Sequence, residues 1–206
     1  QFRREAVILA NLRHSNLPRV TDHFAIENQG QYLVMDYIEG EDLRQRLDRL
    51  GSLPDEEVII LGAAVCDALS YMHALNPPVL HRDIKPGNIL LSQGEAQVTD
   101  FGIAKALAES ADADALTTAG LVLGTPSYMA PEQALSDKLD PRADLYSAAI
   151  VLFEMLTGVT PFDAPTRNEI MVRTAQVEEA PPPITRLMPQ APPVLDMLFA
   201  RALAKD

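Results

Sequence analysis

The chain has 206 residues, enough to bury a substantial core in one or two domains, and 47% of them are hydrophobic while 22% are charged. These fractions are typical of a soluble globular protein and exclude an intrinsically disordered one. Acidic residues outnumber lysine and arginine 29 to 17, giving a formal net charge of −12. We therefore expect no nucleic-acid partner, because binding nucleic acid needs a basic face.

The first predicted elements are a helix and two strands. Apolar residues at helical spacing predict a helix over residues 1–14. Strand-like runs follow at about 19–26 and 31–38, and the turn sequence ENQG joins them. Gly40 then marks a break before a short helix that begins near Leu43.

A long helix is predicted within residues 53–75. Pro54 suits its first turn, and three acidic residues lie at its positive end. Its buried face consists of Val58, Leu61, Val65, Leu69 and Met72. The single cysteine, Cys66, cannot form an internal disulfide and fits a reducing compartment. Because Cys66 falls within this amphipathic pattern, we expect it to be a buried, inert thiol.

Beyond this helix, the sequences NILLS and AQVTD predict two short strands around the turn QGE. A loop rich in Ala, Asp and Thr spans about 104–130, and helices are predicted at about 142–157, 166–177 and 191–204. We interpret the proline-rich residues 180–193 as a stiff connector, with a polyproline ligand for a partner domain as the alternative.

The most apolar run, residues 145–158, is too short to span a bilayer and contains Glu154. We find no signal-peptide pattern in the sequence. We therefore expect a cytoplasmic segment without membrane contact of its own, and a membrane tether elsewhere in a longer parent protein is compatible with this expectation.

The stretch HRDIKPGN crowds polar and charged groups before a predicted strand. Phosphoryl transfer needs metal ligands, a positive group on the moving phosphoryl and an acceptor that orients the attacking hydroxyl. Mg²⁺ prefers hard oxygen ligands. Asp83, Lys85, Asn88 and Asp100 are groups of these kinds at the ends of short strands.

Three motifs carry a family resemblance. HRDIKPGN, DFG at 100–102 and APE at 130–132 resemble, in order and spacing, the catalytic loop, metal loop and activation-segment end of eukaryotic-like protein kinases. The chain most resembles bacterial Hanks-type serine/threonine kinases. This resemblance implies an α+β, protein-kinase-like fold with a truncated N-lobe. Residues 1–38 would hold helix C, strands 4 and 5 and the hinge, and residues 39–206 would form a mostly helical C-lobe that lacks its terminal helix.

The resemblance also implies the roles of the polar residues. Asp83 would accept the proton of the substrate hydroxyl, Lys85 would contact the transferring phosphate, and Asn88 and Asp100 would bind Mg²⁺ or Mn²⁺. Lys85 and Thr125 together resemble the serine/threonine branch, and Thr125 would hydrogen-bond to Asp83 and Lys85. The substrates would then be ATP and the serine or threonine residues of proteins, with a role in signal transduction.

The adenine of ATP would meet the linker YLVMDYIEG. The resemblance makes Met35 the gatekeeper and points backbone groups of Asp36 and Ile38 at the base. Asp42 would lie near the ribose and Leu90 beneath the base. Plain core packing of Met35 is compatible with its role.

Two further positions would support the site. Glu5 matches the helix-C glutamate, and Leu9, one turn on, would pack towards Phe101 and His81. Asp144 resembles the aspartate that anchors the backbone of the catalytic loop.

Arg82 and Lys105 indicate regulation by phosphorylation. In kinases that resemble this chain, the arginine holds a phosphorylated residue of the activation loop with help from a basic residue at the spacing of Lys105. Thr117 and Thr118 are the candidate phosphosites, since a phosphate there would gain charge-assisted hydrogen bonds. The alternative is that they are ordinary solvated loop residues. A kinase–kinase dimer that autophosphorylates this loop is a compatible partner.

The sequence departs from the family pattern before Glu5. The lysine that should pair with Glu5 is absent, because the lysines of the chain are Lys85, Lys105, Lys138 and Lys205. No Gly-rich phosphate loop precedes Glu5 either. A pseudokinase that serves as a scaffold or regulatory binding module is therefore the main alternative, although the retained Asp83, Asn88 and Asp100 argue against it. A small-molecule phosphotransferase is a third reading, which the APE motif disfavours.

Both departures predict that residues 1–206 alone have negligible kinase activity and weak nucleotide affinity. Transfer of ³²P from Mg·ATP to myelin basic protein by the purified chain measures this directly. Label above that of a boiled control would contradict the prediction.

Overall fold

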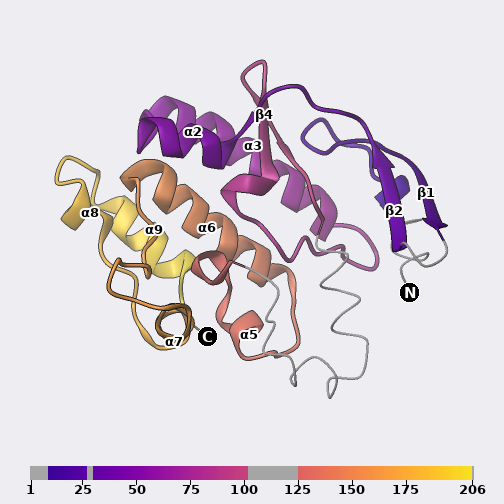
Figure 1. Ribbon diagram of the computed structural model, residues 1–206. Helices are drawn as coiled ribbons and strands as arrows, with labels where there is room; N and C mark the ends of the chain where they lie inside the picture. Colours follow the sequence, from indigo (N-terminus) through magenta and orange to yellow (C-terminus); the bar gives the residue numbers. More distant parts are fainter. Residues whose placement is uncertain (1–8, 27–29, 102–124, 206) are drawn as a thin grey trace.

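The computed structural model describes residues 9–26, 30–101 and 125–205, which form a two-stranded sheet at one end and a mostly helical body beside it (Figure 1). The predicted α+β class is therefore confirmed. In the described part of the chain, no helix is both long and apolar enough to cross a membrane. Four predicted site residues lie outside the described residues: Glu5, Lys105, Thr117 and Thr118.

Strands β1 (Val20–Ile26) and β2 (Gly30–Met35) pair antiparallel, as the turn sequence predicts. Their register sets Phe24 opposite Tyr32, and the two rings stack with centroids 5.4 Å apart. One face of the pair exposes Phe24, Ile26, Tyr32 and Val34. This apolar face is what a sheet of two strands leaves open to solvent.

A second sheet has the strand order β3-β4-β5, in which β3 is Glu41–Asp42, β4 is Ile89–Ser92 and β5 is Glu95–Val98. The β4–β5 hairpin was predicted, and its residues Ile89 and Val98 are fully buried. The pairing of β3 with β4 was not predicted, because two residues are too few to show a strand periodicity.

Helix α2 (Leu43–Leu50) begins directly after β3. The carboxylate of Asp42 accepts a hydrogen bond from the Gln45 amide at 2.8 Å, and the Gln45 side chain accepts one from the Asp42 amide at 3.2 Å. This reciprocal cap satisfies two backbone donors at the start of the helix. It also joins the hinge to the helical body.

Helix α3 (Asp55–His73) buries the apolar face that its periodicity predicts. Cys66 is exposed on this helix, so the expectation of a buried thiol is wrong. The adjacent Val65 belongs to the buried stripe, and a step of one residue turns a side chain about 100° around a helix. Cys66 therefore faces solvent.

Helix α6 (Pro141–Thr157) runs through the centre of the body and is buried along most of its length (Figure 1). Around it lie α7 (Glu169–Glu178) and α9 (Val194–Ala202), close to the predicted helices. The short elements are the 3₁₀ turns η1 (Pro86–Asn88) and η3 (Pro126–Tyr128) and the helices α5 (Pro131–Ala134) and α8 (Ile184–Leu187). Helix α8 lies inside the predicted connector at 180–193.

Gly40 has a steric reason to be glycine. A Cβ at this position would lie 2.0 Å from the carbonyl oxygen of Leu91, closer than any real contact. The break that Gly40 marks in the sequence is thus the point where the hinge crosses the backbone of β4.

We expect Gly40→Ala to lower the free energy of unfolding by about 1–3 kcal/mol, the usual cost of forcing atoms into a packed site. Chemical denaturation measures this. Gly87→Ala is the matched control, because a Cβ there would meet nothing within 4 Å. Equal stabilities of the two variants would contradict the steric explanation.

Candidate functional site

The catalytic-loop stretch is held from behind by one carboxylate on α6. Asp144 is 2% exposed. Its Oδ2 accepts the His81 amide N–H at 2.8 Å, and its Oδ1 accepts the Arg82 amide N–H at 2.7 Å. The ring of His73, at the end of α3, bonds to the same Oδ2 through Nε2 at 2.8 Å. The expectation that Asp144 anchors this loop is confirmed, while the role of His73 was not predicted.

Burial by itself would raise the pKa of the Asp144 carboxyl. The hydrogen bond from His73 and the two backbone donors outweigh burial and hold this pKa below its ordinary value of 3.8. The carboxylate therefore stabilises the fold at pH values above 3.8, and this contribution is lost as the pH falls through the lower folded-state pKa.

Arg82 adopts a left-handed backbone conformation, with φ of 67°. A residue with a Cβ pays a steric penalty there, so the surrounding contacts must hold it in place. Its amide is bonded to Asp144, and its carbonyl accepts a hydrogen bond from the Gln133 side chain at 2.9 Å. Gln133 also accepts the Ala130 amide N–H at 3.0 Å. Gln133 thus ties the loop to α5, a tertiary contact that carries no signal in the sequence.

His81 connects the loop to the segment after β5. Its side chain is fully buried, and burial lowers its pKa, so the ring is neutral at neutral pH. Nε2 lies 2.9 Å from the Thr99 carbonyl and Nδ1 lies 3.3 Å from the Asp83 amide. A neutral ring protonated on Nε2 satisfies both partners. The ring also packs on Phe101, with centroids 5.5 Å apart, as predicted.

Two predicted site residues, Lys85 and Asn88, meet at Asp83. Its Oδ2 accepts a hydrogen bond from Lys85 Nζ at 2.9 Å and another from Asn88 Nδ2 at 3.0 Å. Asn88 Nδ2 also reaches the Asp83 carbonyl at 2.8 Å. These bonds fix the rotamer of the carboxylate while leaving it partly accessible to solvent.

Asp100 lies beside this group because Thr99 is bonded to Asn88. The Thr99 amide and hydroxyl both donate to the Asn88 carbonyl, at 2.8 and 3.3 Å. Asp100 follows with φ of 56° and is exposed. The amide nitrogen of Asn88 points at Asp83, so its Oδ1 is turned the other way. A carboxamide oxygen and a carboxylate near each other are ligands of the kind that Mg²⁺ takes from a protein.

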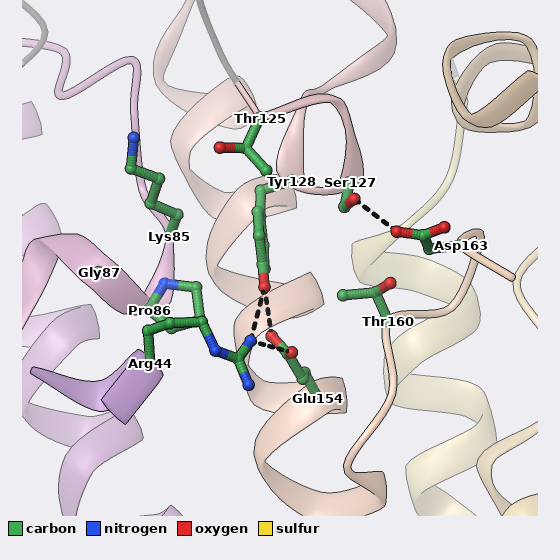
Figure 2. A pocket seen from close by; sticks show the side chains of 10 residues that line it. All are labelled: Arg44, Lys85, Pro86, Gly87, Thr125, Ser127, Tyr128, Glu154, Thr160 and Asp163. Carbon is green, nitrogen blue, oxygen red and sulfur yellow. Dashed lines mark hydrogen bonds and ion pairs between the residues drawn. The ribbon is translucent and has the colours of Figure 1, made fainter. Parts of the chain in front are cut away.

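A pocket of about 380 Å³ opens beside Lys85 and Thr125 (Figure 2). Below them, Glu154 accepts hydrogen bonds from Arg44 and from the Tyr128 hydroxyl, both at 2.6 Å. Burial and the neighbouring Glu154 raise the pKa of the Tyr128 hydroxyl, so it remains a donor. The predicted hydrogen bond from Thr125 to Asp83 and Lys85 stays a prediction.

The residues expected around the adenine are brought to the hinge. Met35 ends β2 and packs partly buried on the core. The Asp36 amide donates to the Arg19 carbonyl at 2.9 Å. Asp42 pairs with Leu90 across β3 and β4, so these two residues are neighbours. The Asp42 carboxylate caps α2, and its contact with a ribose stays a prediction, as does the role of Ile38.

Comparison with known proteins agrees with this geometry. A family model described as "Protein kinase domain" matches residues 1–200. Serine/threonine-protein kinase pkn3 of Myxococcus xanthus is 38% identical over 213 residues, which cover 100% of this chain and 38% of the relative.

Two further relatives are similar to the same extent. The probable serine/threonine-protein kinase PknB of Lactococcus lactis is 37% identical over 100% of this chain and 32% of its own length. Serine/threonine-protein kinase PknB of Mycobacterium leprae is 38% identical over 100% of this chain and 33% of its own length. The chain thus spans about a third of the length of these relatives. Because the family model covers residues 1–200, the chain belongs to the protein kinase domain family.

Proposed function

We propose that the protein containing this chain transfers the γ-phosphate of ATP to serine or threonine hydroxyls of other proteins. The observation that carries the proposal is the Asp83 carboxylate, which Lys85 and Asn88 hold in a single orientation beside an open pocket. An acceptor carboxylate fixed next to a cationic donor is what orienting a hydroxyl towards a phosphoryl group requires.

Asp83 is the group that accepts the proton of the substrate hydroxyl. Lys85 and Asn88 both donate to its Oδ2, and these bonds hold the carboxylate in position for that step. Lys85 is bonded to the Asp83 carboxylate and contacts the transferring phosphate. Magnesium, when bound, neutralises the charge of the nucleotide phosphates. Asn88 and Asp100 are its proposed protein ligands, and Mn²⁺ would fit the same oxygens.

The hinge is the proposed site of the adenine. Because the Asp36 amide already donates to Arg19, the Asp36 carbonyl is the group that can accept a hydrogen bond from the base. A backbone group of Ile38 also faces the base, Leu90 lies beneath it, and Met35 is the gatekeeper.

The pocket beside Thr125 is the proposed site for the peptide around the acceptor residue. Its buried acid, Glu154, is bonded to Arg44 and Tyr128, and Gly87 stands where basic-directed kinases often carry an acid. These two positions therefore give no ground to infer arginine-directed substrates.

Regulation by activation-loop phosphate is part of the proposal. The backbone of Arg82 is bonded on both sides, to Asp144 and to Gln133, which fixes the point from which its side chain leaves the loop. A phosphate on Thr117 or Thr118 would be the anion that Arg82 and Lys105 receive. A cytoplasmic location and autophosphorylation between two copies complete this proposal.

Asp83→Asn in the full-length protein should lower kcat by about 10²–10⁴-fold, the contribution of a positioned general base. The asparagine retains the shape of the side chain, so the thermal unfolding temperature should change little. Incorporation of ³²P into myelin basic protein measures kcat. Asp137→Asn makes the same chemical change on an exposed residue and should retain activity. Undiminished kcat in Asp83→Asn would refute the assignment.

Asp144→Ala should lower the free energy of unfolding by about 2–6 kcal/mol, since two buried N–H groups lose their acceptor at about 1–3 kcal/mol each. Asp144→Asn keeps one acceptor oxygen and should lose less. Urea denaturation at pH 7 gives both values. If Asp144→Ala were as stable as the parent, the carboxylate would not be the anchor of the loop.

A further inference from the structure

Lys205 lies at a junction that the proposed chemistry does not use. It follows α9 and is bonded to a residue of α7. Its Nζ donates to the Tyr146 hydroxyl at 2.6 Å and to the Gln176 carbonyl at 2.7 Å. The same Nζ stands over the ring of Phe162, 4.0 Å from the centroid. Three elements, α6, α7 and the segment before α7, therefore converge on one amine.

The amine remains charged at neutral pH. Burial lowers the pKa of Lys205 to about 8, and the carboxylate of Glu179 partly offsets this. The faces of the Phe162 and Tyr146 rings also favour the cation. An ammonium group can only donate hydrogen bonds. The Tyr146 hydroxyl must therefore accept from Lys205 and direct its own proton elsewhere.

That proton goes to Gln176. The Tyr146 hydroxyl donates to Gln176 Oε1 at 2.7 Å. Fixing the oxygen of the amide also fixes its nitrogen, because the two are on opposite sides of one planar group. Gln176 Nε2 then donates to the Ser127 carbonyl at 2.8 Å and to the Pro126 carbonyl at 3.3 Å. A flipped amide would face these two carbonyls with an oxygen and repel them.

The two carbonyls belong to η3, the turn that directly follows Thr125 and lines the pocket beside Lys85. Gln176 is 0% exposed and Tyr146 is 4% exposed, so water does not replace either partner. Ser147 supports the same turn by donating to the Tyr128 carbonyl at 2.7 Å. The direction in which the carbonyls of η3 point thus depends on a relay that starts at Lys205.

We propose that Lys205, Tyr146 and Gln176 are positioning residues for the proposed peptide site: the relay orients η3, and thereby the pocket wall that meets the protein substrate. This inference rests on the proposed kinase function and assigns residues of α6, α7 and the segment after α9 to its peptide site. Since none of the three touches the nucleotide site described above, the relay affects the peptide and not ATP.

Two substitutions in the full-length protein test the relay at its two ends. Lys205→Met keeps an unbranched apolar stem against Phe162 but removes the donors. Gln176→Glu keeps the shape of the side chain but cannot donate to Pro126 and Ser127. Both should raise KM for myelin basic protein about tenfold, a change of the size that follows from the loss of one hydrogen bond. Neither should change kcat or KM for ATP.

Lys138→Met is the matched control, because it makes the same chemical change on an exposed lysine, and its KM values should equal those of the parent. Lys205→Arg restores a cation with several donors and should recover most of the lost affinity. Hydrogen–deuterium exchange gives a readout independent of activity. The amides of Tyr128 and Met129, which close η3, should exchange faster in Lys205→Met and Gln176→Glu than in Lys138→Met.

Three results would overturn the inference. One is a KM for myelin basic protein in Lys205→Met equal to that of Lys138→Met. Another is exchange at Tyr128 and Met129 that neither substitution changes. The third is a lower kcat together with a lower unfolding temperature and an unchanged KM. That result would mean a general structural role. If the parent protein transferred no phosphate to protein but the exchange differences were seen, the kinase proposal would fail and the relay would stand.

Discussion

The buried carboxylate of Asp144 is the interaction on which the rest of the site depends. A charge that is almost excluded from water is costly unless polar groups replace its hydration. Here the donors are the amides of two consecutive loop residues and an imidazole from α3. The need to solvate one anion thus fixes the backbone of the loop, the end of α3 and the first turn of α6 together.

Residues bonded to this anchor in turn hold their own neighbours in place. The amide of Arg82 is bound to the anchor while its carbonyl is bound to Gln133, so the strained conformation of Arg82 is held at both ends. The ring of His81 is bonded to the Thr99 carbonyl and to the Asp83 amide, so it holds these two residues in place as well. Buried, fully bonded groups lie behind the loop, and the partly exposed groups with proposed chemical roles lie in front. Rigid support behind reactive groups lowers the entropy lost when a substrate is positioned.

Much of this arrangement was predictable, for identifiable reasons. The β4–β5 hairpin, α3 and α6 follow from local periodicity, and the place of Asp83, Lys85 and Asn88 near the end of a strand follows from the strand pattern after them. Asp144 and the His81–Phe101 contact could be expected only through the family resemblance. Gln133, His73 and the Lys205 relay could not be predicted, because each joins residues more than 25 positions apart and leaves no periodic trace. An amphipathic pattern shows which stripe of a helix is buried, but it does not decide whether a residue at the edge of that stripe is buried. Cys66 lies at such an edge, so its burial was predicted wrongly.

The neutral ring of His81 has a consequence for kinetics. Because burial lowers its pKa and both ring nitrogens have fixed partners, the ring does not take up a proton in the range where an ordinary histidine does. Protonation of His81 therefore does not change the internal geometry of the loop near neutral pH. An inflection in the pH–rate profile near neutrality would then not belong to His81.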